Sequence, residues 1–443
     1  MEKLFKTIIF ISFFGTLLAA PSSVPNLSKH PVVLIVSFDG FRSDYLTKTP
    51  TPHLTALMEE GVSVPYMSAQ FPTKTFPNHH SMATGLYPDV HGITDNTVFD
   101  PLHNKRLSGF NDDPEFWNYH PDVLPFWLRN EQAGDGRISG CYLWSGSSQG
   151  YGPDGKLFPT YYLPTYDESI PWETRVEEVI GWITHPSKPA NIVYLYHNEP
   201  DSHGHSYGTD DEETLAEIRR SDDRAGHLIQ ALKDANIYDR INLIFVSDHG
   251  MQSVHQTNII NTTLMADTSL YANHGGTPVY HILPNNSADL EDLYNTFKRE
   301  SEGKNFTVYK KEEMLGTYNY GTNRRIMDIL LLAEPGYGFE DMWRFSADGI
   351  AGVHGYDNRS PNMRALFIGR GPNFKKSYKL TAPISNLDLV PLFSRLMGVQ
   401  EPPNNGSIDI IGGILDTSSS GVIITSGTFQ FLFGLTFLVY QSI

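Results

Sequence analysis

Aspartate and histidine side chains, which are common ligands in hydrolytic metal sites, recur in four short clusters of this sequence. In one cluster the two types stand four residues apart, and in another they are adjacent. Sets of Asp and His without Cys are typical of zinc in hydrolytic sites, where positions stay open for substrate. Two ions about 3.5–4 Å apart form a clamp for in-line displacement at phosphorus. The candidate ligands are Asp39, Asp201, His205, Asp248, His249 and His354.

A rigid, proline-bracketed segment at 71–79 supplies candidate nucleophiles. It holds two threonine hydroxyls, Thr73 and Thr75. A threonine hydroxyl is a poor nucleophile until its pKa is lowered, which a bound divalent cation achieves without a general base. The sequence contains no Walker A loop, so it gives no support to P-loop chemistry.

Three short apolar runs, at 32–38, 192–196 and 241–247, predict the strands that carry these clusters. Near-continuous apolar strands are typical of a sheet buried on both faces, which indicates an α/β fold. A fourth strand is predicted at 365–368 and a helix with a charged outer face at 214–235. Each of the first three strands ends at a polar cluster, and open α/β sheets place their sites at the carboxyl ends of strands. A single Asp-Gly pair is usually a turn, so it is this coincidence that favours a site.

Composition limits the classes of protein that the chain can belong to. With 443 residues, 40% of them hydrophobic, it can bury a sizeable core, and one catalytic domain is expected at about 27–411 with a possible lobe or insertion at 286–349. The formal charge of −17 argues against binding to a nucleic-acid scaffold, although bound metal ions can still attract a phosphate. The single Cys141 excludes an internal disulfide framework.

Both ends of the chain have the pattern of targeting signals. Residues 1–20 join a basic flank to a short apolar run and small residues, as in a secretory signal peptide. Residues 412–443 join small residues, a spacer and a terminal apolar tail, as in a GPI-attachment signal, with a single-pass helix as the alternative. A glycosylated protein on the extracellular face of the plasma membrane is therefore expected. Its six sequons are at Asn26, Asn261, Asn285, Asn305, Asn358 and Asn405.

Six motifs occur in order between about residues 30 and 410. They are Asp39-Gly40-Phe41-Arg42, Pro72-Thr73-Lys74-Thr75-Phe76-Pro77-Asn78, His91-Gly92-Ile93 with Asn96, Glu199-Pro200-Asp201 with Gly204-His205, Ser247-Asp248-His249-Gly250-Met251 and His354-Gly355-Tyr356-Asp357-Asn358. Together they closely resemble the ectonucleotide pyrophosphatase/phosphodiesterase family of the alkaline phosphatase superfamily, in a short form without somatomedin-B-like or nuclease-like domains. The resemblance implies an alkaline-phosphatase-like α/β fold, whose central mixed, mainly parallel sheet has helices on both faces.

The resemblance also implies a role for each matching position. Thr75 would be the nucleophile, and Asn96 matches an asparagine that helps to bind a non-bridging phosphate oxygen. His79 and His203 fall on positions that are not ligands in the family. Two zinc ions per chain are implied, the first bound by Thr75, Asp39, Asp248 and His249, and the second by Asp201, His205 and His354.

Members of the family divide between nucleotides and choline or lysophospholipid phosphodiesters, and the aromatic residues here favour nucleotides. Phe76 follows the implied nucleophile, Tyr166 aligns with a tyrosine that faces that ring in nucleotide-cleaving members, and Trp144 resembles a residue of the base pocket. Stacking of a base is worth about 1–3 kcal/mol. We therefore expect hydrolysis of nucleotides such as ATP, ADP, NAD or dinucleoside polyphosphates to nucleoside 5′-monophosphates, through a covalent intermediate on the threonine.

The sequence also departs from the family pattern. Ser147-Ser148 stands where nucleotide-cleaving members carry an acidic residue, Asn198 replaces a glutamate, and the family's cysteine pairs are absent. Two alternatives therefore stay open. One is a choline-phosphodiester or lysophospholipid hydrolase, and the other is a cell-surface recognition protein with secondary catalysis.

Overall fold

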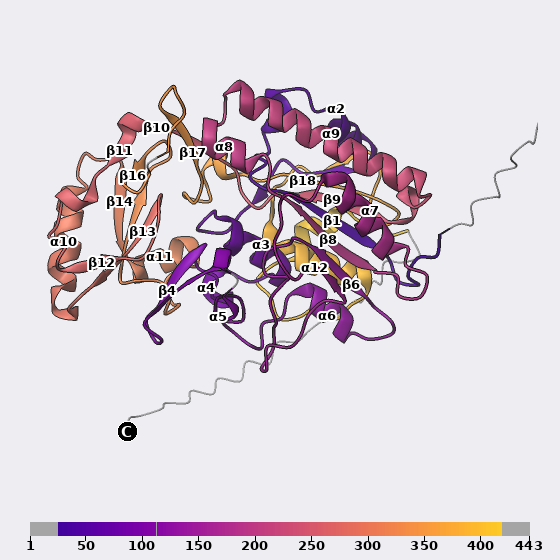
Figure 1. Cartoon of the computed structure of the whole chain (residues 1–443), viewed down its shortest axis with the longest axis horizontal. Helices are drawn as coiled ribbons and strands as arrows, with labels where there is room; N and C mark the ends of the chain where they lie inside the picture. The colour runs from indigo at the N-terminus through magenta and orange to yellow at the C-terminus, as the bar shows by residue number, and fades with distance from the viewer. Residues whose placement is uncertain (1–24, 112, 343, 419–443) are drawn as a thin grey trace, which may run out of the picture.

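A large, mainly parallel sheet forms the centre of the molecule, and a smaller sheet forms a lobe at one end (Figure 1). The structure is a computed structural model that describes residues 25–111, 113–342 and 344–418. The fold is the expected α/β class, with helices on both faces of the central sheet.

The central sheet has eight strands, of which the middle ones are entirely buried. β1 pairs in parallel with both β8 and β9, whereas β18 runs antiparallel to its neighbours β9 and β2. The three apolar runs form these parallel strands, and the fourth prediction corresponds to β18, so all four strands are confirmed. In spatial order the strands are β19 (Tyr378–Lys379), β2 (Val62–Ser63), β18 (Phe367–Arg370), β9 (Asn242–Val246), β1 (Val33–Phe38), β8 (Ile192–His197), β6 (Ser139–Tyr142) and β7 (Tyr161–Tyr162).

Helices cover the sheet in two layers, one on each face. The predicted long helix is α9, which begins at Glu212, where the Asp211 side chain accepts a hydrogen bond from the backbone N–H of Glu213 and so caps the helix. Its buried residues recur at helical spacing, which places one face against the sheet. One layer contains α2 (Pro52–Glu60), α7 (Trp172–Ile183) and α9 (Glu212–Asp234), and the other contains α3 (Thr75–Thr84), α6 (Phe126–Gln132) and α12 (Leu389–Met397).

The lobe is a four-stranded antiparallel sheet with its own apolar core. It begins at Tyr271, upstream of the stretch 286–349 expected from the sequence. The Asp89 carboxylate ties it to the central domain by accepting hydrogen bonds from the backbone amides of residues 321–323. Its elements are β12 (Tyr271–Asn273), β13 (Val279–Pro284), β15 (Ile329–Ala333) and β14 (Phe306–Lys310), with α10 (Leu290–Glu300) and α11 (Lys311–Tyr318).

Short elements connect these parts. The strand pairs are β10 (Gln252–His255) with β17 (Ile350–Val353), β11 (Ile259–Ile260) with β16 (Gly338–Phe339), β4 (Thr97–Asp100) with β5 (Lys105–Ser108), and β20 (Ile384–Ser385) with β3 (Met67–Ser68). The remaining α-helices in the described part of the chain are α1 (Tyr45–Lys48), α4 (Pro88–His91), α5 (Pro114–Trp117), α8 (Asp201–Tyr207) and α13 (Ile408–Ile411).

The expected targeting segments fall mostly on residues that the structure does not describe. The proposed signal peptide at 1–20 lies outside the described residues, as does the part of the proposed C-terminal signal beyond 418. Packing of the domain continues past residue 411, because Ile414 and Leu415 are buried in the main core. None of the helices found in the described residues has the length and apolar character needed to cross a membrane.

Candidate active site

Three carboxylates meet because the strands that carry them are neighbours in the central sheet. Asp39 directly follows β1, Asp248 follows β9, and Asp201 begins α8 after β8. The backbone N–H of Asp201 donates to the backbone carbonyl of Asp39 at 3.1 Å, which brings two of these chain ends together. Gly40 makes this approach possible, since a side chain there would lie 2.9 Å from the Asp201 Cβ atom. The predicted site therefore lies at the carboxyl ends of adjacent parallel strands.

The first group of predicted ligands surrounds the Nε2 atom of His249. This atom lies 3.0 Å from Asp248 Oδ2, 3.4 Å from Asp39 Oδ1 and 3.2 Å from Thr75 Oγ1. Thr75 is the first residue of α3, so its hydroxyl lies at the N-terminus of a ten-residue helix. Helix N-termini favour negative charge, as on a phosphate. We call these four residues the buried group.

The second group consists of Asp201, His205 and His354, which we call the open group. The Asp201 carboxylate lies 3.4 Å from His205 Nε2 and 3.6 Å from His354 Nε2. The open group contacts the buried group, because the imidazoles of His354 and His249 stack with centroids 3.6 Å apart. All seven residues that sequence motifs suggested as metal ligands are thus brought together.

The histidines are oriented so that one ring nitrogen of each faces the cluster. The Nδ1 atoms of His205, His249 and His354 lie 2.8–2.9 Å from the backbone carbonyls of residues 352, 250 and 73. With Nδ1 donating to a carbonyl, Nε2 keeps its lone pair, which is the arrangement found around ligating histidines. The second nitrogen of each ring is therefore a potential ligand.

The three carboxylates of the site each have one buried oxygen atom that lacks a hydrogen-bond partner. Asp39 Oδ1, Asp201 Oδ1 and Asp248 Oδ2 are buried without a hydrogen-bond partner, and no described Lys or Arg pairs with them. Burial and the neighbouring carboxylates raise the pKa of Asp39, and burial likewise raises that of Asp201. Burial opposes ionisation of Asp248 too, but His249 and His79 hold its pKa below the usual range. An uncompensated cluster of buried carboxylates suits divalent cations.

Two other histidines lie near the cluster without joining it. His79 Nδ1 is 3.4 Å from Asp248 Oδ2, but both of its ring nitrogens have partners, the Thr75 carbonyl and the Ser37 hydroxyl. Burial lowers the pKa of His79, and its ring packs against Trp144 and Tyr196. His203, on α8, instead pairs through Nδ1 with Glu199 at 3.0 Å.

A cavity of about 390 Å³ opens beside the two groups and has aromatic walls. Among its lining residues, the Phe76 ring lies 4.7 Å from Phe110 and 5.2 Å from Trp117. The exposed Tyr166 also lines the cavity and lies 6.4 Å from Tyr196. The described residues that line it include no Lys or Arg. Such a cavity fits a flat, uncharged ring, with the metal ligands at one end.

Two residues of the cavity wall differ strongly in exposure. Trp144 borders the cavity but is only 2% exposed, because its ring packs against His79 and Tyr194. Phe110, which no motif indicated, is 71% exposed and forms part of the wall. It lies in a short 3-10 turn without hydrophobic periodicity, so no sequence signal could have found it.

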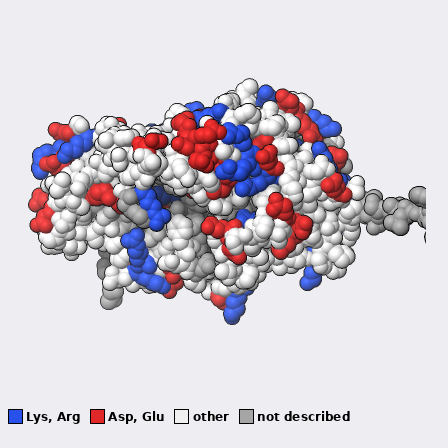
Figure 2. All heavy atoms as spheres, turned by 45° about the horizontal axis from the view of Figure 1, so that its top comes forward, with Lys and Arg blue, Asp and Glu red and all other residues white. Residues whose placement is uncertain are grey.

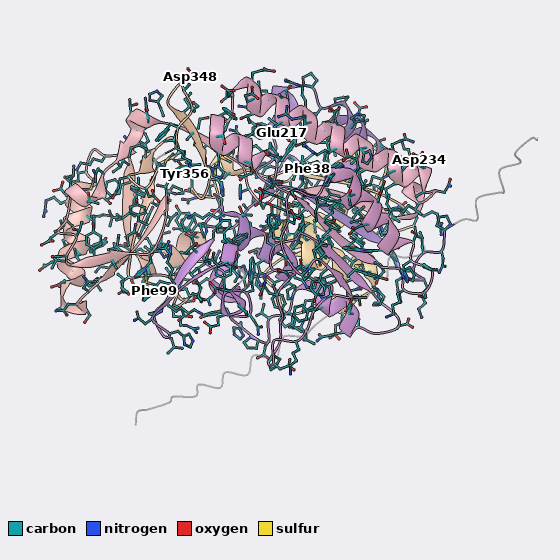
Figure 3. All side chains as sticks on the ribbon, in the orientation of Figure 1. Phe38, Phe99, Glu217, Asp234, Asp348 and Tyr356 are labelled. Atoms are coloured by element: carbon teal, nitrogen blue, oxygen red, sulfur yellow. The ribbon has the colours of Figure 1, made fainter. Side chains whose placement is uncertain are left out.

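Asn96 lies between the aromatic cavity and a second cavity of about 550 Å³. Its Oδ1 accepts a hydrogen bond of 2.9 Å from the backbone N–H of Phe76, which fixes the amide and leaves its Nδ2 as the donor group. The second cavity shares His205 and His354 with the first and reaches the lobe at Thr277. Figure 3 labels Phe38, which precedes Asp39 and belongs to the main core, and Tyr356, which is two residues after His354 and belongs to the core of the lobe. The site therefore lies where the lobe meets the central sheet.

Charge on the surface is mixed. On the face seen in Figure 2, Lys and Arg are interspersed with Asp and Glu and form no extended basic area. One contact on α9 illustrates this mixing, since Arg220 and Arg224 both pair with the buried Glu217. This face has no basic footprint of the kind that binds a nucleic-acid backbone.

The fold, the strand-end carboxylates and the paired ligand groups define a metal-dependent hydrolase of the phosphodiesterase class. Residues 33–357 match the model of the type I phosphodiesterase / nucleotide pyrophosphatase family. The chain belongs to this family of enzymes, as its motifs suggested.

Named relatives agree over nearly the whole chain. Human ectonucleotide pyrophosphatase/phosphodiesterase family member 5 is 36% identical over 94% of this chain and 84% of its own. Human bis(5′-adenosyl)-triphosphatase ENPP4 is 35% identical over 90% and 85%. The solved structure of murine ENPP5 matches with a TM-score of 0.79 at 36% identity, covering 87% of this chain and 100% of that one. An inactive threonine-to-alanine variant of murine ENPP5, in complex with AMP, matches equally well.

Proposed function

We propose that this enzyme hydrolyses nucleotides to nucleoside 5′-monophosphates with Thr75 as the nucleophile and two zinc ions as cofactors. The observation that carries the proposal is the position of Thr75 Oγ1, at the start of α3 and 3.2 Å from His249 within the buried group. The aromatic cavity beside it supports a nucleoside as the other part of the substrate.

The residues present fit a pair of zinc ions. The open group would hold one ion, since its three ligand atoms lie close enough together to bind the same ion. The buried group would hold the other, since Asp248 Oδ2, Asp39 Oδ1 and Thr75 Oγ1 lie within 3.4 Å of His249 Nε2 and no described Lys or Arg pairs with its carboxylates. Bound divalent ions would lower the pKa of the threonine hydroxyl and neutralise charge on the phosphate. Nitrogen and oxygen ligands of this kind favour zinc among the common hydrolytic metals.

Protein groups would act on the phosphorus in two displacements. Thr75 Oγ1 attacks in line, the bond from phosphorus to the leaving oxygen breaks, and the nucleotide becomes esterified to Thr75. Asn96 Nδ2 donates a hydrogen bond to a non-bridging oxygen as negative charge develops there. Water then hydrolyses the ester and frees the threonine hydroxyl. Two inversions give net retention of configuration at phosphorus.

The relatives support a nucleotide substrate. One is named for its action on a bis(5′-adenosyl) triphosphate, and another binds AMP when a threonine is replaced. In this chain Phe76 and Tyr166 line the cavity that leads to Thr75, so either ring could stack on a base. Trp144, at 2% exposure, would act mainly by supporting the wall. We propose ATP, ADP, NAD and dinucleoside polyphosphates as the substrate class.

The test is a substrate panel on the purified enzyme, with and without chelator. We expect chelator-sensitive release of nucleoside 5′-monophosphate from nucleotides, and its loss in Thr75→Ala. Release of phosphocholine from glycerophosphocholine, without nucleotide hydrolysis, would instead favour the choline-phosphodiester alternative. Full biological effect of Thr75→Ala without hydrolysis would favour a recognition protein.

We also propose an extracellular, membrane-anchored location, supported by the sequence patterns at 1–20 and 412–443. Release from cells by phosphatidylinositol-specific phospholipase C would support the GPI anchor over a membrane-spanning tail. Of the proposed glycosylation sites, Asn358 is the least suited, because its Nδ2 atom, the attachment point, donates to the Ala69 carbonyl. Four of the sequon asparagines are exposed, namely Asn26, Asn261, Asn285 and Asn405, whereas Asn305 and Asn358 are half-buried.

A further inference from the structure

Tyr196 lies on β8 next to the buried group, although it is not one of the seven ligands. Its hydroxyl donates a hydrogen bond of 2.6 Å to Asp39 Oδ2, and the residue is only 7% exposed. The contact follows from sheet register, because Tyr196 pairs with Ser37 on β1, two residues before Asp39. A hydroxyl hydrogen bond of this length to a buried carboxylate is charge-assisted and about twice as strong as a neutral one.

Because of this hydrogen bond, the two carboxylate oxygens of Asp39 have different surroundings. Oδ2 is engaged by Tyr196, whereas Oδ1 is buried without a hydrogen-bond partner and lies 3.4 Å from His249 Nε2. The hydroxyl therefore fixes the rotation of the carboxylate and leaves one oxygen directed at the cluster. Groups that orient a ligand in this way tune the affinity of a metal site.

The other ligands of the buried group are oriented mainly by backbone atoms. Asp248 Oδ1 accepts from the backbone N–H groups of Gly40 and His249 at 3.1 and 3.0 Å, with the Ser247 hydroxyl at 3.3 Å. The His249 ring is held by the carbonyl of residue 250. Substitution cannot remove these backbone groups. Asp39, by contrast, depends on a side chain from a neighbouring strand.

Tyr196 also forms part of the wall of the aromatic cavity. Its ring lies 6.4 Å from that of Tyr166 and 5.2 Å from that of His79. The residue thus connects the surface that would receive a nucleoside to a ligand of the buried group. A side chain that touches both is placed to set the geometry of the site.

We propose that Tyr196 is a positioning residue that orients Asp39 for metal binding, so that the affinity of the buried group for zinc depends on its hydroxyl. This inference rests on the proposed zinc site and is independent of which substrate the enzyme cleaves. The open group, which has no contact with this hydroxyl among the described hydrogen bonds, binds its ion without it.

The test is a zinc titration of metal-free protein against a chromophoric chelator, comparing Tyr196→Phe with Tyr194→Phe. Tyr194 is a matched control, because it lies on the same face of β8, is fully buried, and its hydroxyl has no hydrogen-bond partner. In Tyr196→Phe we expect one of two zinc equivalents to bind about 10- to 100-fold more weakly, with the other unchanged. In Tyr194→Phe both equivalents are expected to bind as in the wild type.

Thermal unfolding of the metal-free proteins serves as the check on folding, since both variants keep their aromatic rings. Unchanged affinity for both equivalents in a folded Tyr196→Phe protein would overturn the inference, as would an equal loss in Tyr194→Phe. A wild-type protein that binds no zinc would instead overturn the proposed cofactor and this inference together. The two failures are therefore distinguishable, and neither depends on measuring turnover.

Discussion

The two ligand groups use similar side chains in different surroundings. In the buried group, the side chains of Asp39, Asp248 and His249 are 3%, 0% and 0% exposed. In the open group, the side chains of Asp201, His205 and His354 are 15%, 44% and 7% exposed, so His205 is the most accessible ligand. The buried group includes the threonine hydroxyl and lies against the strand ends of the main sheet. In the open group, Asp201 and His205 lie on α8, whereas His354 directly follows β17, and the two histidines line both cavities.

The difference in exposure between the two groups matches two requirements of the reaction. A nucleophile must be held rigidly before it attacks. Burial among side chains whose orientation is fixed by hydrogen bonds achieves this. A leaving group and an incoming water molecule need access, which the half-exposed His205 at the junction of both cavities allows. We therefore expect substitutions in the buried group to affect chemistry and folding together, and those in the open group to affect mainly metal binding.

The largest effect is expected from Thr75→Ala. Loss of the nucleophilic hydroxyl should lower kcat by at least about 10³-fold, because no other described hydroxyl occupies its position beside His249. The measurement is turnover of p-nitrophenyl-TMP, with zinc content as the control for an intact site. Thr75→Ser, which keeps a hydroxyl, should retain much of the activity. An alanine variant as active as the serine variant would contradict the proposed nucleophile.

The comparison between the groups is tested by Asp248→Asn and His205→Ala. Each variant should lose about one zinc ion per chain on dialysis, measured by mass spectrometry of the metal. Unfolding in denaturant without metal should separate them, because Asp248 is fully buried and accepts two backbone N–H hydrogen bonds while His205 is half exposed. We expect Asp248→Asn to cost roughly 1–3 kcal/mol and His205→Ala at most about 0.5 kcal/mol. Equal costs would show that burial does not distinguish the groups.

Phe110→Ala tests whether the aromatic wall of the cavity binds the base of the substrate without affecting the metal site. Loss of this exposed ring beside Phe76 should raise KM for nucleotides about fivefold, the lower end of base-stacking energies, with zinc content unchanged. Ethyl p-nitrophenyl phosphate, which lacks a base, is the control substrate, and its KM should not change. A similar rise for both substrates would mean that Phe110 shapes the metal site rather than the base pocket.

The smallest effect concerns pH in metal-free protein. Burial, Asp248 and Asp201 raise the pKa of Asp39 above its usual 3.8, so the folded state binds this proton more tightly than the unfolded chain does. The stability due to Asp39 is therefore complete below about pH 3.8 and is lost as pH rises through the raised pKa.

An Asp39→Asn variant carries no such penalty. Without metal, its melting temperature should rise relative to the wild type as pH increases above 3.8, because the variant has no carboxylate to ionise in this buried position. Saturating zinc should reverse the order, because the variant lacks a ligand. Calorimetry at several pH values measures both, and a constant difference across pH would show that the pKa of Asp39 is not raised in the folded protein.

Local sequence was sufficient for the three strands that precede Asp39, Asp201 and Asp248. The runs at 32–38, 192–196 and 241–247 are buried strands because their residues are apolar on both faces of the sheet. The polar residues that follow them converge because parallel neighbours end at one edge. Order and spacing of the motifs therefore indicated both the fold and the family.

Features that depend on tertiary contacts could not be read from the sequence. Phe110 becomes a cavity wall only because its turn lies over Phe76, and Tyr196 reaches Asp39 only through the register of β8 with β1. The burial of Cys141 in β6 is likewise a result of tertiary packing. The lobe begins at Tyr271, where short antiparallel strands give weaker patterns than the parallel core.

Hydrolysis of ATP in ¹⁸O-labelled water tests the central claim most directly, since it reports which phosphorus receives the water oxygen. We predict that the label appears in AMP, that pyrophosphate is released unlabelled, and that chelation of zinc stops the reaction. Label in a released phosphate or pyrophosphate, or turnover that persists without metal, would contradict attack by Thr75 at the nucleoside-bearing phosphorus.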